Sequence, residues 1–189
     1  MFRNAILAAS ALALATSAAT AAQAATETGP YVGVAATVEA TNADLGVVDS
    51  LGATGVGASA FAGYTIALGN GLFVAPEANI DLNSVEAKVA DGTDVLRAKA
   101  RWGWGVGARV GYDLSDSTAG YLRAGYARNQ IKVVTNGIAD KAWGDGVRVG
   151  GGVETRLAPQ LRLRAEYNYV NYEKGVSNNQ GLVGLVYGF

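Results

Sequence analysis

The chain has 189 residues, of which 50% are hydrophobic and only 16% are charged, and it contains no cysteine and no histidine. These two absences exclude disulfide bonds, cysteine zinc sites, an imidazole base and a Ser-His-Asp triad. The 15 basic and 16 acidic residues leave a net charge of -1, so the overall basic footprint of a nucleic-acid-binding protein is absent. The 26 glycines, about twice the average share, argue against a mostly helical domain.

Residues 1–24 have the three parts of a secretory signal peptide. Arg3 supplies the positive charge, a short apolar stretch follows, and residues 22–24 form a small-residue cleavage site. The coincidence of the three favours a signal peptide over an alanine-rich amphipathic helix of the folded domain. We expect cleavage after Ala24, which leaves residues 25–189 as the barrel domain. After residue 25 no stretch approaches the roughly 18 consecutive apolar residues that a membrane helix requires.

The rest of the sequence alternates between apolar and polar or small residues with a period of two, which is typical of β-strands. Eight segments show this pattern, and they span about residues 31–40, 56–68, 72–83, 98–113, 120–129, 143–157, 161–169 and 182–189. Short turns near 69–71, 114–118 and 158–160 are interleaved with longer loops near 41–54, 84–96, 130–142 and 173–179. An eight-stranded up-and-down meander has this arrangement when all its short turns lie at one end. Pro76 is the misfit, because proline cannot donate a ladder hydrogen bond.

The composition of the two strand faces indicates which side of the sheet is outside. Alternation alone fits both a soluble lipocalin-like barrel and a transmembrane barrel. The polar face combines long charged side chains with many glycines, which suits the crowded interior of a narrow barrel. The apolar face has aromatic residues near strand ends, as a membrane girdle requires. The girdle candidates are Trp102, Trp104, Tyr112, Trp143, Tyr167, Tyr169 and Tyr187. We therefore predict an all-β fold, an eight-stranded antiparallel up-and-down transmembrane β-barrel.

The chain resembles the OmpA-type and opacity-type small outer-membrane barrels of Gram-negative bacteria. The resemblance rests on the signal peptide, the eight segments, the opening residues 29–33 and the final GLVGLVYGF. It implies an outer-membrane location with both termini in the periplasm and four loops outside. It also implies that the C-terminal segment, with Tyr187 and Phe189, is the signal read by the barrel-assembly machinery. The family includes anchors, adhesins, narrow pores and a few enzymes. Its enzymes of this size depend on a histidine, so the resemblance implies no catalysis here.

Acidic residues on the predicted inward face invite two interpretations. Glu77 and Asp81 lie four residues apart on one strand and could form a general acid and base pair. Ion pairing is the preferred interpretation, because the next strand brings Lys99 and Arg101 to the same face. With the hairpin centred near residue 90, Asp81 is expected opposite Lys99. Glu77 is then diagonal to Arg101, within cross-strand reach.

A further ion pair is predicted between Glu154 and Arg164, which face each other across the turn at residues 158–160. An unpaired ion inside a narrow barrel costs on the order of several kcal/mol of desolvation. The predicted inward charges are nine basic residues against five acidic ones. They are Arg97, Lys99, Arg101, Arg109, Arg123, Arg148, Arg156, Arg162 and Arg164, against Glu39, Glu77, Asp81, Glu154 and Glu166. We expect a lumen filled by side chains and trapped water. If the barrel conducts, the positive excess predicts a preference for anions.

Two further motifs resemble ligand-binding sites, but another interpretation is preferred for each. Residues 55–60 fit the GxGxxA form of a dinucleotide fingerprint, but a genuine site opens a helix, whereas residues 55–68 alternate as a strand. Acidic residues in the first two long loops could bind calcium, although solvated charge or cation bridges to lipopolysaccharide are preferred. They are Asp44, Asp49, Glu86, Asp91 and Asp94. No cofactor or metal is expected.

These observations predict an integral outer-membrane barrel with a structural or surface-contact role in the cell envelope and no catalysis. The expected partners are outer-membrane lipid, lipopolysaccharide and the barrel-assembly machinery, without nucleic acid, and we expect a monomer. Three alternatives stay open. They are a narrow porin-like channel with mild anion preference, an adhesin or surface antigen, and a soluble lipocalin-like binder.

Overall fold

The computed structural model describes residues 26–43, 51–84, 86–91, 94–135 and 138–189, and places their side chains except at 42–43, 51–53, 86–91, 94–101, 131–135, 138–142 and 174. The predicted signal peptide therefore lies outside the described residues. The strands are β1 (Gly29–Ala43), β2 (Leu51–Gly69), β3 (Leu72–Asn83), β4 (Glu86–Asp91), β5 (Asp94–Asp113), β6 (Thr118–Thr135), β7 (Ile138–Ala158), β8 (Leu161–Tyr172) and β9 (Val176–Gly188). One 3₁₀ turn, η1 (Glu173–Gly175), joins β8 to β9.

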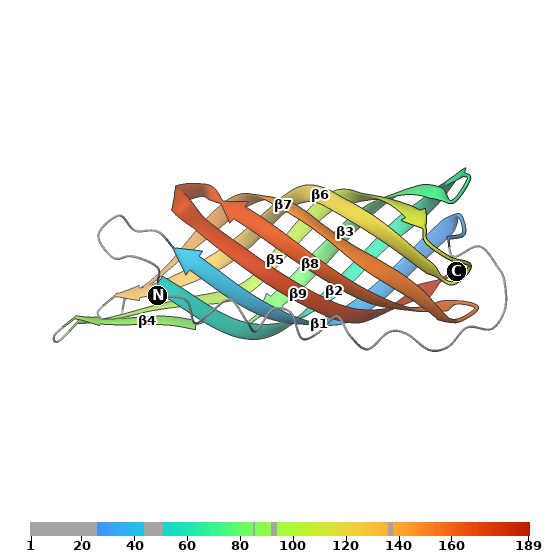
Figure 1. Ribbon diagram of the computed structural model, residues 1–189. Coiled ribbons are helices and arrows are strands. Elements are labelled where there is room, and N and C mark those ends of the chain that lie inside the picture. Colours follow the sequence, from blue (N-terminus) through green and yellow to red (C-terminus); the bar gives the residue numbers. More distant parts are fainter. Residues whose placement is uncertain (1–25, 44–50, 85, 92–93, 136–137) are drawn as a thin grey trace, which may run out of the picture.

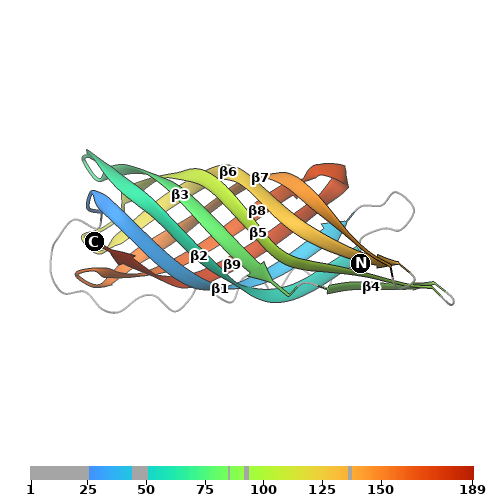
Figure 2. The same cartoon turned by 180° about the vertical axis from the view of Figure 1, so that it is seen from behind.

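The strands form one antiparallel sheet that closes on itself (Figure 1 and Figure 2). Its order is β3-β2-β1-β9-β8-β7-β6-β5-β4, and an additional pairing of β3 with β5 closes the ring. β3 and β4 follow one another along β5, opposite residues 102–112 and 94–99 respectively. They are therefore two pieces of one barrel strand. The ring has eight strands in up-and-down order, as the alternation predicted.

The three short turns and the chain end lie together at one end of the barrel, here named the C-terminal rim (residues 69–71, 114–117, 158–160 and 189; Figure 1, right). Backbone hydrogen bonds join neighbouring segments there, for example from Phe189 N to Pro30 O at 3.1 Å. The first turn is tight because Gly69, Asn70 and Gly71 all have positive φ, which glycine adopts without strain. The predicted grouping of short turns at one end is confirmed.

At the opposite end, here named the loop rim, the strands run past their predicted boundaries. β4 pairs with the start of β5, and the end of β6 pairs with the start of β7, as hairpins that continue beyond the barrel body (Figure 1, left). The predicted loops at 84–96 and 130–142 are therefore wrong over most of their length, because most of these residues form strands. A hairpin with water on both faces does not need alternating hydrophobicity, so the sequence pattern fades before the ladder ends.

Burial alternates along the strands and assigns the faces as predicted. On β6, Leu122 is 73% exposed, whereas the neighbouring Arg123 is 5% exposed. The outer face of the described barrel is thus mainly apolar and its lumen mainly polar, which is the reverse of a soluble lipocalin-like barrel. Among the described residues, no helix is long and apolar enough to cross a membrane.

Pro76 lies within β3 and is accommodated by a break in one ladder. The pairing of β2 with β3 is interrupted beside it, at residues 64–65 and 75–76, while the pairing of β3 with β5 continues. The break removes the demand for a hydrogen bond that a proline nitrogen cannot donate.

Candidate functional site in the barrel interior

The centre of the lumen is occupied by a cluster of buried ion pairs. Arg164 on β8 lies between two carboxylates, with Nη1 2.8 Å from Glu77 Oε2 and Nη2 2.7 Å from Glu154 Oε1. Arg109 on β5 contacts the same two carboxylates, and its Nε lies 3.3 Å from Glu77 Oε2. Two arginines therefore share two carboxylates, and this mutual pairing offsets the desolvation penalty that a lone ion has in such a position.

A second set of contacts extends this cluster. Arg123 Nη1 lies 3.0 Å from Glu77 Oε1 and 3.1 Å from Glu166 Oε1. Tyr121 and Asn168 donate hydrogen bonds to the two oxygens of Glu166, at 2.6 and 2.7 Å. Glu77 is thus the common partner of three arginines, which come from β5, β6 and β8. The cluster connects strands that are not neighbours in the sheet.

Toward the loop rim, the network continues through an ion pair and several uncharged polar side chains. Arg148 Nη2 lies 2.8 Å from Asp81 Oδ2, and Ser59 and Asn79 donate to the same carboxylate at 2.7 and 2.8 Å. Glu39 accepts hydrogen bonds from two amide side chains of β9. Most polar groups of this layer thus find partners inside the barrel, although Arg148 Nε and Thr37 Oγ1 are buried without one.

Four inward aromatic rings each lie over a glycine on the neighbouring strand. The pairs are Tyr31 with Gly63, Phe61 with Gly33, Phe73 with Gly111, and Tyr121 with Gly152. A Cβ atom at any of these glycines would approach the aromatic side chain to 2.2–2.6 Å. The rings in turn lie against the arginines, as where the guanidinium carbon of Arg164 stands 4.1 Å from the centroid of Phe61. Glycine on the inward face therefore makes room for rings as well as for long charged side chains.

The structure brings together one of the predicted ion pairs. Glu154 and Arg164 are direct cross-strand partners on β7 and β8, and their charged groups are in contact. A short turn joins β7 to β8, so the position of the turn determines which residues of the two strands face each other.

The predicted placement of Asp81 opposite Lys99 is wrong, because Asp81 lies opposite Gly103. The error comes from the hairpin between the two strands. Its register pairs Asp91 with Asp94, so its centre lies about two residues beyond the predicted residue 90. A two-residue displacement of the centre moves every cross-strand partner by four residues.

The same displacement separates Glu77 from Arg101. Glu77 lies opposite Gly107. Its charged partners are Arg109 of β5, Arg123 of β6 and Arg164 of β8. The side chains of Lys99 and Arg101 fall outside the described ones, so their own contacts stay predictions.

The predicted charge excess depends on the same undescribed segment. Of the nine expected inward basic residues, Arg97, Lys99 and Arg101 have no described side chain. The other six lie on the inward face of their strands, as do all five expected acids. The described part of the lumen is therefore close to balanced, and an anion preference stays a prediction.

The aromatic residues predicted as a girdle lie on the outer face of their strands. Trp102 and Trp143 meet edge to face with ring centroids 5.2 Å apart, and Trp104 packs against Tyr126 at 5.6 Å. The guanidinium carbon of Arg128 stands 5.1 Å from the ring of Trp143. This aromatic group lies toward the loop rim.

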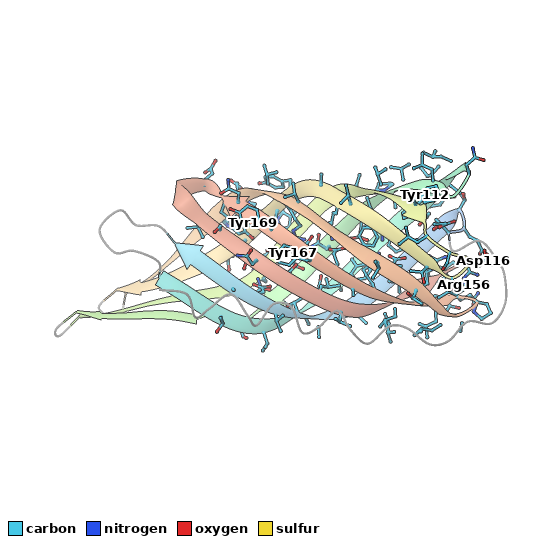
Figure 3. All side chains as sticks on the ribbon, viewed as in Figure 1. Tyr112, Asp116, Arg156, Tyr167 and Tyr169 are labelled. Atoms are coloured by element: carbon cyan, nitrogen blue, oxygen red, sulfur yellow. The ribbon has the colours of Figure 1, made fainter. Side chains whose placement is uncertain are left out.

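The remaining girdle candidates lie at other levels of the barrel. Tyr112 and Tyr187 are close to the C-terminal rim, and Tyr167 and Tyr169 follow one another along the outside of β8 (Figure 3). At the chain end, the rings of Tyr187 and Phe189 pack edge to face with centroids 5.1 Å apart.

Several network residues were not singled out from the sequence. They are Tyr31, Ser59, Phe61, Phe73, Asn79, Tyr121, Asn168, Asn178 and Gln180. The strand periodicity places most of them on the inward face, which was the available signal. Their partners depend on cross-strand register and on contacts across the lumen, which the sequence pattern does not contain.

The carboxylates at the centre of the network are engaged by arginines. Glu77, Glu154 and Glu166 all contact arginines, so none has the free carboxylate that a general base needs. Among the described residues, no group of three acidic side chains could hold a metal ion. The five loop acids considered for calcium lie outside the described side chains, and residues 55–60 lie within β2 rather than at the start of a helix.

The sequence matches a family model described as "Outer membrane protein beta-barrel domain" over residues 9–189. The chain is 36% identical over 97 residues to a 25 kDa outer-membrane immunogenic protein of Brucella ovis, a match that covers 51% of this chain and 47% of that protein. It is 29% identical over 126 residues to a 31 kDa outer-membrane immunogenic protein of Brucella melitensis, covering 60% of this chain and 52% of the relative. The matches thus span about half the length of these relatives.

Solved structures share the fold at low sequence identity. Neisserial surface protein A has a TM-score of 0.62 at 23% identity, with 85% of this chain and 97% of that chain covered. The attachment invasion locus protein Ail of Yersinia pestis also has a TM-score of 0.62, at 14% identity, with 87% and 100% covered.

Proposed function

The chain belongs to the outer membrane protein β-barrel domain family, and from this membership we propose that it is a closed scaffold that presents its loop rim at the cell surface, without an open pore and without catalysis. The location itself follows from the family and from relatives named as outer-membrane proteins. A structural or surface-contact role agrees with both.

One observation carries the proposal, namely the ion-pair cluster around Glu77 and Arg164. Both side chains are fully buried and stand at the centre of the lumen, where an open pore needs a continuous water path. An eight-stranded barrel has an interior just wide enough for side chains to fill. The cluster also engages three of the buried carboxylates, Glu77, Glu154 and Glu166, which supports a role without catalysis.

A surface-antigen role is the second candidate, and the relatives favour it. Both Brucella proteins are named immunogenic, and a surface antigen needs exposed segments. In this chain the hairpin of β4 with the start of β5 extends beyond the barrel body at the loop rim (Figure 1). A hairpin in this position is within reach of an external partner.

We assign each proposed partner to one part of the barrel surface. Membrane lipid covers the exposed apolar side chains of the outer face. Lipopolysaccharide meets the edge-to-face pair of Trp102 and Trp143, and the assembly machinery reads β9 together with Phe189. We propose a monomer, since the sheet closes within one chain and leaves no edge to pair with a second copy.

Gene deletion and complementation test the role. A structural role predicts that cells without the protein become more sensitive to detergents and large antibiotics. A variant that lacks residues 86–99, the protruding hairpin, then restores resistance as the unmodified protein does. A surface-contact role predicts instead that the hairpin deletion loses antibody or host-cell binding. Unchanged sensitivity and unchanged binding in the deletion strain contradict both roles.

A further inference from the structure

A cavity of about 220 Å³ opens at the C-terminal rim, inside the mouth of the barrel. Its walls come from three segments that meet there: the residues before β1, the turn between β7 and β8, and the end of the chain. Two arginines line it, Arg156 of β7 and Arg162 of β8. Arg156 is labelled at this rim in Figure 3.

The two arginines are direct cross-strand partners on the inward face of the hairpin. Like charges directly opposite each other in an antiparallel pair are destabilising. The arrangement differs from the centre of the lumen, where each arginine faces a carboxylate.

Arg162 lacks the partners that the other buried arginines have. It is 8% exposed, and its Nε, like that of most lumen arginines, is buried without a hydrogen-bond acceptor; the difference lies in its missing ion pair. Within the described part of the chain, no carboxylate lies in salt-bridge range of its guanidinium. Glu154, an acid on the adjacent strand, contacts Arg109 and Arg164 instead. Arg162, a buried arginine at a cavity, therefore has no direct ion-pair partner among the described residues.

The cavity is accessible to a ligand next to this guanidinium. Gly188 lies beside it, where a Cβ would stand 3.8 Å from Arg162 Nη2, so position 188 adds no side chain over the group. Across the mouth, Glu27 Oε1 lies 3.5 Å from Arg156 Nη1, and the Glu27 side chain is more than half exposed. The mouth therefore already attracts one oxyanion, a carboxylate from the segment before β1.

We propose that this mouth site, formed by Arg156 and Arg162, binds a phosphate group. Two guanidinium forks offer planar pairs of donors, and a phosphate supplies several oxygens and a charge of about -1.5 to -2 to match them. A carboxylate, with two oxygens and one charge, can satisfy only one fork. The phosphate comes either from the solution or from a phospholipid headgroup at the rim, and both sources have the same chemistry.

Calorimetric titration of inorganic phosphate into the purified protein, folded in a phosphate-free detergent, tests the site. Saturable binding is expected, and Arg162→Gln is expected to weaken it by about tenfold or more, because charge-assisted hydrogen bonds are lost. Arg128→Gln is the matched control, since Arg128 is an exposed arginine of the outer face that pairs with Asp145. It is expected to leave phosphate binding unchanged.

A gain-of-binding variant keeps the test independent of any folding defect in Arg162→Gln. Glu27→Gln removes the competing carboxylate and is expected to tighten phosphate binding by about two- to fivefold. Acetate is expected to bind more weakly than phosphate. Unfolding in urea then separates the sources: stabilisation by inorganic phosphate indicates the free ion, and stabilisation only in bilayers that contain phosphatidylglycerol indicates the headgroup.

The proposal is overturned if neither source stabilises the protein. It is also overturned if acetate binds as tightly as phosphate, or if Arg162→Gln and Arg128→Gln have the same effect.

Discussion

Arg164 and Glu77 meet across the lumen, with Nη1 of the arginine 2.8 Å from Oε2 of the carboxylate and neither side chain exposed. They belong to β8 and β3, which are not paired in the sheet. The contact therefore ties opposite walls of the barrel together, in addition to the ladders that join neighbouring strands. Since Glu77 also contacts Arg109 and Arg123, its loss leaves an excess of buried positive charge.

Glu77→Gln is expected to destabilise the barrel by about 3 to 5 kcal/mol, the cost of breaking a buried ion pair by removing one partner. The free energy of unfolding in urea, followed by tryptophan fluorescence in lipid vesicles, measures the effect. The expected loss is large because a single carboxylate neutralises several arginines.

The matched control for this substitution is Asp145→Asn. Asp145 forms an ion pair with Arg128 at 3.2 Å, but their side chains are 38% and 39% exposed. An exposed pair contributes at most about 1 kcal/mol. Equal effects of the two substitutions would show that burial of the central cluster does not matter for stability.

Gly63→Ala is expected to destabilise the barrel by about 1 to 3 kcal/mol, because overpacking forces a ring or backbone to move. A Cβ at this position meets the Tyr31 hydroxyl at 2.2 Å. Gly181→Ala is the control, since its Cβ meets only a methyl of Val38, at 3.2 Å. The same urea unfolding experiment compares the two, and a harmless Gly63→Ala contradicts the packing of rings over glycines.

The faces of the strands could be predicted from the sequence, but most interior contacts could not. The strand pleat fixes a period of two, so the assignment of Arg109 and Arg123 to the inside is correct. The pair of Glu154 with Arg164 also follows from the sequence, because a short turn determines its register. Asp81 was misplaced because the long hairpin after it gives no sequence signal for its centre.

Contacts across the lumen could not be predicted from the sequence. Arg164 and Glu77 come from strands on different sides of the barrel, and their levels depend on how all eight strands are staggered when the sheet closes. No local pattern contains that stagger. The unpartnered Arg162 is invisible to sequence analysis for the same reason, since the sequence shows only another inward arginine.

Variants that retain one of Trp102, Trp104 or Trp143 test the predicted girdle. Lipids brominated at different depths of the acyl chain quench a nearby tryptophan. If these residues lie at the membrane interface, bromines close to the headgroup quench each tryptophan more strongly than bromines at the bilayer centre. Stronger quenching from the centre would place the aromatic group inside the hydrocarbon core and contradict the girdle.

Deletion of Phe189 is expected to reduce assembly in cells while leaving folding in detergent intact. The residue is 71% exposed, and its ring packs only at the edge of Tyr187 among the aromatic contacts of the described residues. Its removal loses this edge contact and one backbone hydrogen bond, to Pro30, which is a small part of the folding energy. Its proposed role is recognition by the assembly machinery. The amount of folded protein in the outer membrane, compared with refolding yield in detergent, separates the two effects. Equal reductions in both contradict the recognition role.

Single-channel recording in planar lipid bilayers tests the closed lumen most directly. The unmodified protein is expected to give no stable conductance steps, because the cluster of Glu77, Glu154, Arg109 and Arg164 fills the centre of the barrel. The double variant Glu77→Ala with Arg164→Ala removes two of these four side chains while keeping the net charge, and it is expected to open a conducting path. Stable channel steps in the unmodified protein, of the same size as in the double variant, would contradict a plugged barrel.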